Sequence, residues 1–176
     1  MKIVKVFNRP DAQVNRAADV PDIANQLTTY QIIHFATHGL LNSASPALSG
    51  LIMSLIDRQG DAQNGFLRLN DIFNLDLGAE IVVLSACQTA LGKRVKGEGM
   101  IGLTRAFMYA GAGRVLVSLW SVDDAATAEL MSRFYRSLIS EGRSAAGALR
   151  QAQLEMRTET RWQAPYFWAA FAVQGE

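Results

Sequence analysis

The chain has 176 residues, a length that suits one folded domain. Its composition, 49% hydrophobic and 19% charged residues, predicts a packed core and excludes a disordered chain. Its 17 basic and 16 acidic side chains give a formal net charge of +1, which predicts no basic face for nucleic acid. One Cys and two His argue against a disulfide framework, a zinc ribbon and a Cys- or His-rich metal site. We expect no cofactor.

The apolar stretches are short. The longest, Ile81–Ala86 and Val115–Trp120, fall far below the length of a membrane span. The first residues lack the apolar core of a signal peptide. These features predict a cytoplasmic protein that does not associate with membranes.

The N-terminal segment predicts a strand–helix–strand unit. Lys2–Phe7 is a β-rich run, Val20–Leu27 has a proline where the first helical turn tolerates one, and Gln31–Ala36 reads as a second strand. A connection of this kind makes the two strands parallel.

A β-hairpin insertion is expected next, from Leu51–Asp57 and Phe66–Leu69 with a turn rich in Gly and Asp between them. Asn70-Asp71 could then cap a short helix. Five apolar residues within Glu80–Ala86 predict a central parallel strand that is buried on both faces.

The rest of the chain alternates helices with strands, which indicates an α/β layered fold. The expected elements are a helix at Gly99–Ala110, a strand at Arg114–Trp120, a helix capped by Asp123 and Asp124 that runs to about Ser140, a helix from Ser144 to about Thr158, and a strand at Phe167–Val173.

Two rare side chains follow two of these strands. His38 comes just after Gln31–Ala36, and Cys87 just after Glu80–Ala86. Ligands bind at the carboxyl edge of open parallel sheets, so neighbouring strands would bring the imidazole and the thiol together. An imidazole activates a thiol as a nucleophile, and the amides of Gly39 and Cys87 could stabilise an oxyanion. This chemistry predicts attack on an acyl compound, most simply a peptide bond.

Each residue also has a structural interpretation. A lone Cys is more often inert packing, and a His after a strand more often a hydrogen-bonding loop residue. His34 lies inside its strand and is better explained as a buried or half-buried core residue. Thr37, Ser85 and Gln88 are expected to shape the site without an assigned step.

Seven blocks of sequence resemble the CHAT domains, caspase-like cysteine peptidases related to separase and often fused to tetratricopeptide repeats. The resemblance runs from about Tyr30 to Gln174. The blocks occur in the family's order: Phe35–Gly39, Val83–Thr89, Gly97–Gly99, Ser118–Trp120 with Val122–Asp124, Phe134-Tyr135, Ala148–Arg150 and Pro165–Phe171.

The resemblance implies a caspase-like α/β fold, with a sheet of mainly parallel strands flanked by helices. It also implies a Cys–His dyad in which His38 is the general base and Cys87 the nucleophile, with Gly39 in the oxyanion hole. The expected partners are a protein or peptide substrate and, as a regulator, a tetratricopeptide-repeat or other protein. Residues 1–176 would form a single CHAT-like domain that is short at its N-terminus.

Asp123 and Asp124 have two interpretations. After a strand end they could bind a basic side chain of the substrate, and related separases favour arginine before the cut. Before a helix, Asp is also a common cap, and we favour capping for at least one of them.

Two other function classes stay open. Gly97, Gly99 and Gly102 fit the GxGxxG pattern of a dinucleotide-binding loop, but ten residues separate Gly97 from the preceding strand, whereas the fingerprint needs the first glycine directly after it. The second alternative is a catalytically silent caspase-like interaction module.

Overall fold

A computed structural model describes residues 3–7, 27–42, 45–55, 60–62, 64–85, 88–89, 98–121 and 123–175. The chain divides into two compact units. The first comprises the described residues up to Val117 with Gln174 and Gly175, and the second is Ser118–Val173. None of the described helices is long and apolar enough to cross a membrane.

The main sheet is built from parallel strands, as the apolar runs predict. Its strand order is β1-β2-β6-β8-β9, and the pairs β1–β2, β2–β6 and β6–β8 are parallel. Ile32–Phe35 and all of β6 are buried, because parallel strands are covered on both faces. The strands are β1 (Ile3–Phe7), β2 (Ile32–Ala36), β6 (Ile81–Leu84), β8 (Arg114–Ser118) and β9 (Phe171–Gly175), whose Gln174 and Gly175 belong to the first unit.

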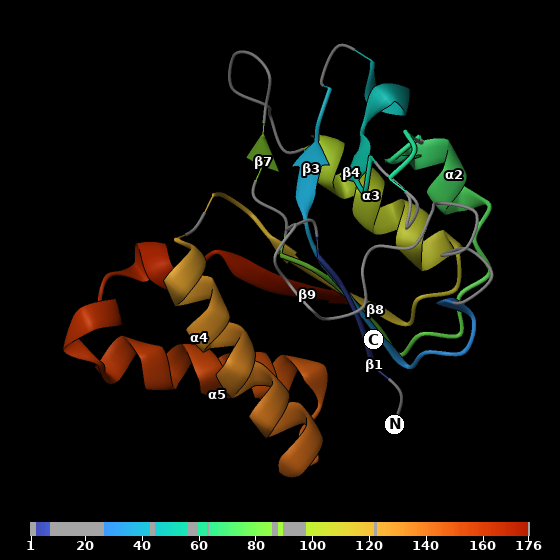
Figure 1. Ribbon diagram of the computed structural model, residues 1–176. Coiled ribbons are helices and arrows are strands. Elements are labelled where there is room, and N and C mark those ends of the chain that lie inside the picture. Colours follow the sequence, from blue (N-terminus) through green and yellow to red (C-terminus); the bar gives the residue numbers. More distant parts are fainter. Residues whose placement is uncertain are drawn as a thin grey trace. The chain divides into compact units, whose positions relative to one another are not determined.

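A second, four-stranded sheet has the order β5-β4-β3-β7. Figure 1 shows β3 between β7 and β4. The predicted hairpin is confirmed, since β4 and β5 pair antiparallel with Leu51 opposite Leu67. Its first strand is shorter than predicted and ends at Ile52. The strands are β3 (His38–Leu40), β4 (Gly50–Ile52), β5 (Phe66–Arg68) and β7 (Gln88–Thr89).

The first unit also contains a 3-10 turn, η1 (Pro46–Leu48), and helices α2 (Leu69–Phe73) and α3 (Glu98–Tyr109). Helix α3 confirms the predicted helix, and its buried Phe107 lies 5.3 Å from Phe35 between ring centroids. Gly111 ends it with a φ of 105°. The predicted cap at Asn70-Asp71 is wrong by position: Arg68 precedes the helix, and Asp71 accepts the Arg68 backbone N–H from within it.

The second unit is mainly helical. Helix α4 (Asp124–Tyr135) continues into a π-helical segment, η2 (Arg136–Ser140), where one helix was expected, and α5 (Ala145–Thr158) follows. The 3-10 turns η3 (Thr160–Trp162) and η4 (Pro165–Phe167) come next. Because η4 occupies the start of the predicted Phe167–Val173 strand, β9 begins only at Phe171.

The fold is therefore α/β, with a mainly parallel sheet, flanking helices and a hairpin, which confirms the predicted class. Most of the predicted helix at Val20–Leu27 lies outside the described residues. Leu27 is buried in the core of the first unit.

Candidate active site

His38 lies at the point where the chain passes from one sheet to the other. Only Thr37 separates the end of β2 from β3, in which His38 is the first residue. Thr37 is buried, and its hydroxyl donates a hydrogen bond to the carbonyl of Ile52, the residue that faces His38 across β4. The His38 side chain is exposed, so the fold presents an imidazole to solvent directly beyond a buried strand.

Gly39, like Leu40, is paired on both sides of β3. It is buried, and it faces Leu51 of antiparallel β4 and Gln88 of parallel β7. Figure 1 shows β3 and β7 side by side. Strand β3 follows β2 along the chain, and β7 follows β6. The parallel pair β3–β7 therefore continues the parallel pair β2–β6.

The register of these two pairs is the same. Phe35 faces Leu84 in the main sheet, and Gly39 faces Gln88 in the second sheet. The separation along the chain is 84 − 35 = 49 positions in the first case and 88 − 39 = 49 in the second. Cys87 lies outside the described residues, so its approach to His38 stays a prediction.

His34, in the middle of β2, and Ser85, directly after β6, make a contact that sequence reasoning missed. His34 is only 5% exposed, which confirms its prediction as a core residue. Its Nε2 lies 2.8 Å from the hydroxyl of Ser85, and the Ser85 backbone N–H donates to the carbonyl of Phe35 at 3.2 Å. The signal in the sequence was a polar residue inside an apolar strand, which needs a hydrogen-bonding partner when it is buried.

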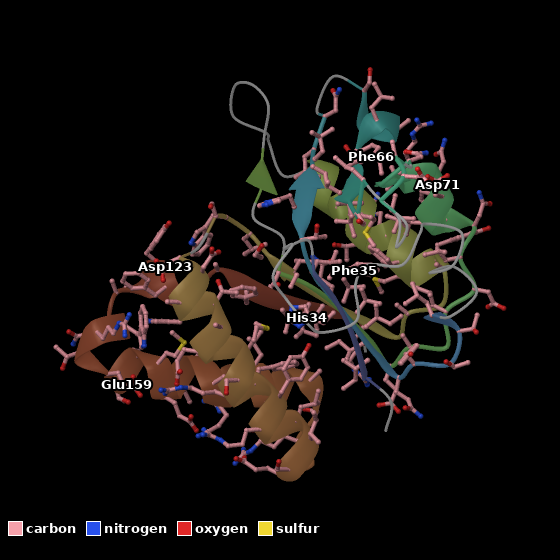
Figure 2. The ribbon with its side chains drawn as sticks, in the orientation of Figure 1. His34, Phe35, Phe66, Asp71, Asp123 and Glu159 are labelled. Atoms are coloured by element: carbon pink, nitrogen blue, oxygen red, sulfur yellow. The ribbon has the colours of Figure 1, made fainter. Side chains whose placement is uncertain are left out.

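Asp123 and Asp124 belong to the second unit, whereas His38 and Gly39 belong to the first. Asp123 caps α4, because its Oδ1 accepts the backbone N–H of Ala126 at 2.9 Å, which confirms the predicted capping (Figure 2). Asp124 is exposed in the first turn of the same helix. Their role in substrate binding stays a prediction.

Aromatic residues fix the loop that precedes Asp123. The Trp120 indole N–H donates to the carbonyl of Tyr166 at 3.1 Å, and the Tyr166 hydroxyl donates to the carbonyl of Ser121 at 2.8 Å. These reciprocal bonds join the segment after β8 to η4. Through the Trp120–Tyr166 bond, two of the sequence blocks that resemble the CHAT family, Ser118–Trp120 and Pro165–Phe171, contact each other.

The structure offers little support for a dinucleotide loop. Helix α3 begins at Glu98, which is 98 − 84 = 14 positions after the end of β6. A dinucleotide fingerprint places its first glycine in a tight turn directly between strand and helix. Across the described ranges, no three His, Cys, Asp or Glu side chains come together as a site for a metal ion.

The chain was compared with known proteins. The family model described as "CHAT domain" matches residues 2–176. Tetratricopeptide repeat protein 28 of Mus musculus is 40% identical over 105 residues, covering 60% of this chain and 4% of the mouse protein. The human protein of the same name is 31% identical over 191 residues, covering 92% of this chain and 8% of the human protein. This chain thus spans a small fraction of these relatives, and it belongs to the CHAT domain family.

Proposed function

We propose that the chain is a cysteine endopeptidase domain in which His38 and Cys87 form the catalytic dyad. Membership of a caspase-like family supports this proposal. The names of the two relatives mention tetratricopeptide repeats and do not mention a peptidase activity. The proposal therefore depends on the geometry around His38.

The shared register of 49 positions is the observation that carries the proposal. His38 and Cys87 are also 87 − 38 = 49 positions apart, and each directly precedes a residue of the Gly39–Gln88 pair. The same register holds four residues upstream, where Phe35 faces Leu84. Neighbouring strands lie about 4.8 Å apart, a spacing that lets two side chains on facing positions interact. We infer from this shared offset that Cys87 is the nucleophile that His38 activates.

The dyad would act by nucleophilic catalysis. The His38 imidazole takes the proton of the Cys87 thiol, and the sulfur attacks the carbonyl carbon of the peptide bond. The C–N bond then breaks, His38 returns the proton to the leaving amine, and a thioester remains on Cys87. Water, deprotonated by His38, attacks the thioester, releases the acid product and restores the thiol.

Other groups have proposed roles in the same reaction. The backbone N–H groups of Gly39 and Cys87 would stabilise the oxyanion of the tetrahedral intermediate. Asp123 and Asp124 would attract a basic side chain of the substrate. A tetratricopeptide-repeat segment or protein is the proposed regulator, since both relatives are named for such repeats. The proposed setting is cytoplasmic.

The first prediction tests the dyad with a proteome-derived peptide library, whose cleavage is followed by mass spectrometry. Cys87→Ala should abolish cleavage because it removes the nucleophile. His38→Ala should slow it by roughly 10²- to 10⁴-fold because it removes the general base. Ser140→Ala, an exposed residue of η2, is the control and should cleave like the parent chain.

Thiol reactivity provides a second readout. Cys87 is the single Cys of the chain, so iodoacetamide reports on that residue alone. We expect an apparent thiol pKa below the free value of about 8.5, and His38→Ala should raise it. Cleavage that survives Cys87→Ala would contradict the proposal. An ordinary thiol pKa without any cleavage would favour the silent interaction module.

A further inference from the structure

We propose that His34 and Ser85 are positioning residues, whose hydrogen bond holds the middle of β2 against the end of β6 and so aligns His38 with Cys87. The inference rests on the proposed function and adds a pair of residues that do not touch the substrate. The contact itself is part of the described structure, with His34 Nε2 and Ser85 Oγ separated by 2.8 Å.

The place of His34 in the sheet is the first argument. The residue, labelled in Figure 2, lies in β2. It faces Lys5 of β1 and Val83 of β6, and its side chain is 5% exposed. Its neighbours Ile33 and Phe35 are fully buried and apolar, as expected for a strand inside a parallel sheet. A Val or Ile at this position would avoid the cost of burying an imidazole. Stability of the sheet alone therefore does not account for a histidine here.

The place of Ser85 is the second argument. Ser85 is the residue directly after β6, and it bonds to β2 twice: its hydroxyl contacts His34, and its backbone N–H donates to the Phe35 carbonyl. The bonds join His34 and Phe35, the third and fourth residues of β2, to the residue directly after β6. Beyond this junction, each stretch of chain leaves the main sheet and pairs again as β3 and β7.

The distance along the chain to the proposed dyad is the third argument. His34 precedes His38 by four residues, and Ser85 precedes Cys87 by two. The register is 49 positions on both sides of the junction, so a slip here would move the imidazole relative to the thiol. A backbone hydrogen bond sets the spacing of the strands, and the His34–Ser85 bond adds a side-chain contact that a register slip would break. A misplacement of about 1 Å can cost a catalytic group roughly a hundredfold in rate.

The test measures the alkylation of Cys87 by iodoacetamide as a function of pH in the intact chain. Ser85→Ala removes the hydroxyl and His34→Val removes the imidazole, and each should raise the apparent pKa of the thiol. We expect a rise of about one unit in the thiol pKa of each variant, which slows alkylation about tenfold at a pH below both pKa values. His34→Gln keeps a hydrogen-bonding group and should restore most of the rate.

Two comparisons separate positioning from a general loss of structure. Ser137→Ala removes another buried hydroxyl, which donates to Glu141 in the second unit, and should leave the pH profile unchanged. The double variant His34→Val/Ser85→Ala should react about as slowly as either single variant, because both remove the same bond. Independent structural defects would instead multiply to about a hundredfold. If His34→Val fails to fold by circular dichroism, Ser85→Ala and His34→Gln carry the test.

The outcomes distinguish the two proposals. A depressed thiol pKa in the parent chain that Ser85→Ala leaves unchanged would overturn the positioning role while supporting the dyad. An ordinary thiol pKa in the parent chain would overturn the dyad and, with it, the positioning role.

Discussion

The two units of the chain specify their structures by different means. In the first unit, buried apolar strands set a register, and the candidate site follows from that register: Phe35 faces Leu84, and Gly39 faces Gln88. In the second unit, capped helices are joined by charged side chains. Arg133 of α4 contacts Glu159 after α5, and Arg136 contacts Glu155 of α5 at 2.6 Å.

The two units differ in how precisely these interactions position their residues. A strand register places every residue relative to its neighbour through backbone hydrogen bonds, which suits groups that must meet within a few ångströms. Ion pairs between long side chains tolerate small movements and depend on salt. We therefore expect substitutions in the first unit to alter both stability and the reactivity of Cys87, and those in the second unit to alter mainly stability.

The largest expected effect comes from the two buried phenylalanines. Phe35 and Phe134 are both fully buried, one in each unit. Phe35→Ala and Phe134→Ala should each lower the free energy of unfolding by about 3–5 kcal/mol in urea denaturation followed by circular dichroism. Only Phe35→Ala should also raise the apparent pKa of Cys87 under native conditions, because Phe35 packs on Phe107 at the end of β2.

Milder variants keep this comparison informative if the alanine variants do not fold. Phe35→Leu and Phe134→Leu retain most of the apolar volume. Equal shifts in the alkylation profile of the two leucine variants would show that the second unit is as important for the site as the first. That result would contradict the expectation that substitutions in the second unit alter mainly stability.

A smaller effect is expected at Arg133, whose side chain is only 12% exposed among three carboxylates. Burial lowers the pKa of Arg133, but hydrogen bonds to Glu159 and Glu129 outweigh it, so the net shift is upward. Arg133→Ala leaves the carboxylates without this cation and should cost about 1–2 kcal/mol of unfolding free energy. The loss should shrink in 1 M NaCl, and Arg133→Lys should retain part of the stability.

The pair of Arg143 and Glu141 is the matched control, since both side chains are exposed. Hydrogen bonds from Arg143 and Ser137 hold the pKa of the Glu141 carboxyl below its usual value. A lowered pKa contributes stability above the ordinary pKa that is lost as the pH falls through the lowered one. This contribution is present at pH 7 but small, because solvent screens a pair whose two side chains are exposed. Arg143→Ala should thus change stability little at pH 7, and an effect as large as that of Arg133→Ala would contradict the importance of burial.

Much of the fold follows from the sequence, because its strongest elements carry their own patterns. The apolar runs in β2, β6 and β8, the periodic apolar positions of α3 and the caps Asp123 and Ser144 are local signals. The second sheet has no such signal beyond its hairpin. Strands β3 and β7 have only three and two residues and include Gly and polar side chains. They pair because the longer strands before them, β2 and β6, bring the two segments together.

Part of the candidate site can likewise be predicted from the sequence, and part cannot. His38, Gly39 and Cys87 can be selected from residue type and position, since each follows a recognisable strand. The contact between His34 and Ser85 needs the register of β2 against β6, which a single sequence does not provide. The shared offset of 49 positions is likewise a property of paired strands. The dyad itself remains a prediction because Cys87 lies outside the described residues.

The smallest expected effect separates the two interpretations of Asp123. Asp123→Ala removes the acceptor for the Ala126 N–H and should cost about 1 kcal/mol of unfolding free energy, as Ser144→Ala should at the start of α5. Asp123→Asn keeps a capping oxygen and should restore most of the stability, but it removes the charge. If the charge also binds substrate, Asp123→Asn should slow cleavage of peptides with a basic residue before the cut and spare other peptides. A stable Asp123→Asn variant with an unchanged cleavage pattern would leave Asp123 as a helix cap alone, and an unchanged stability in Asp123→Ala would contradict the cap.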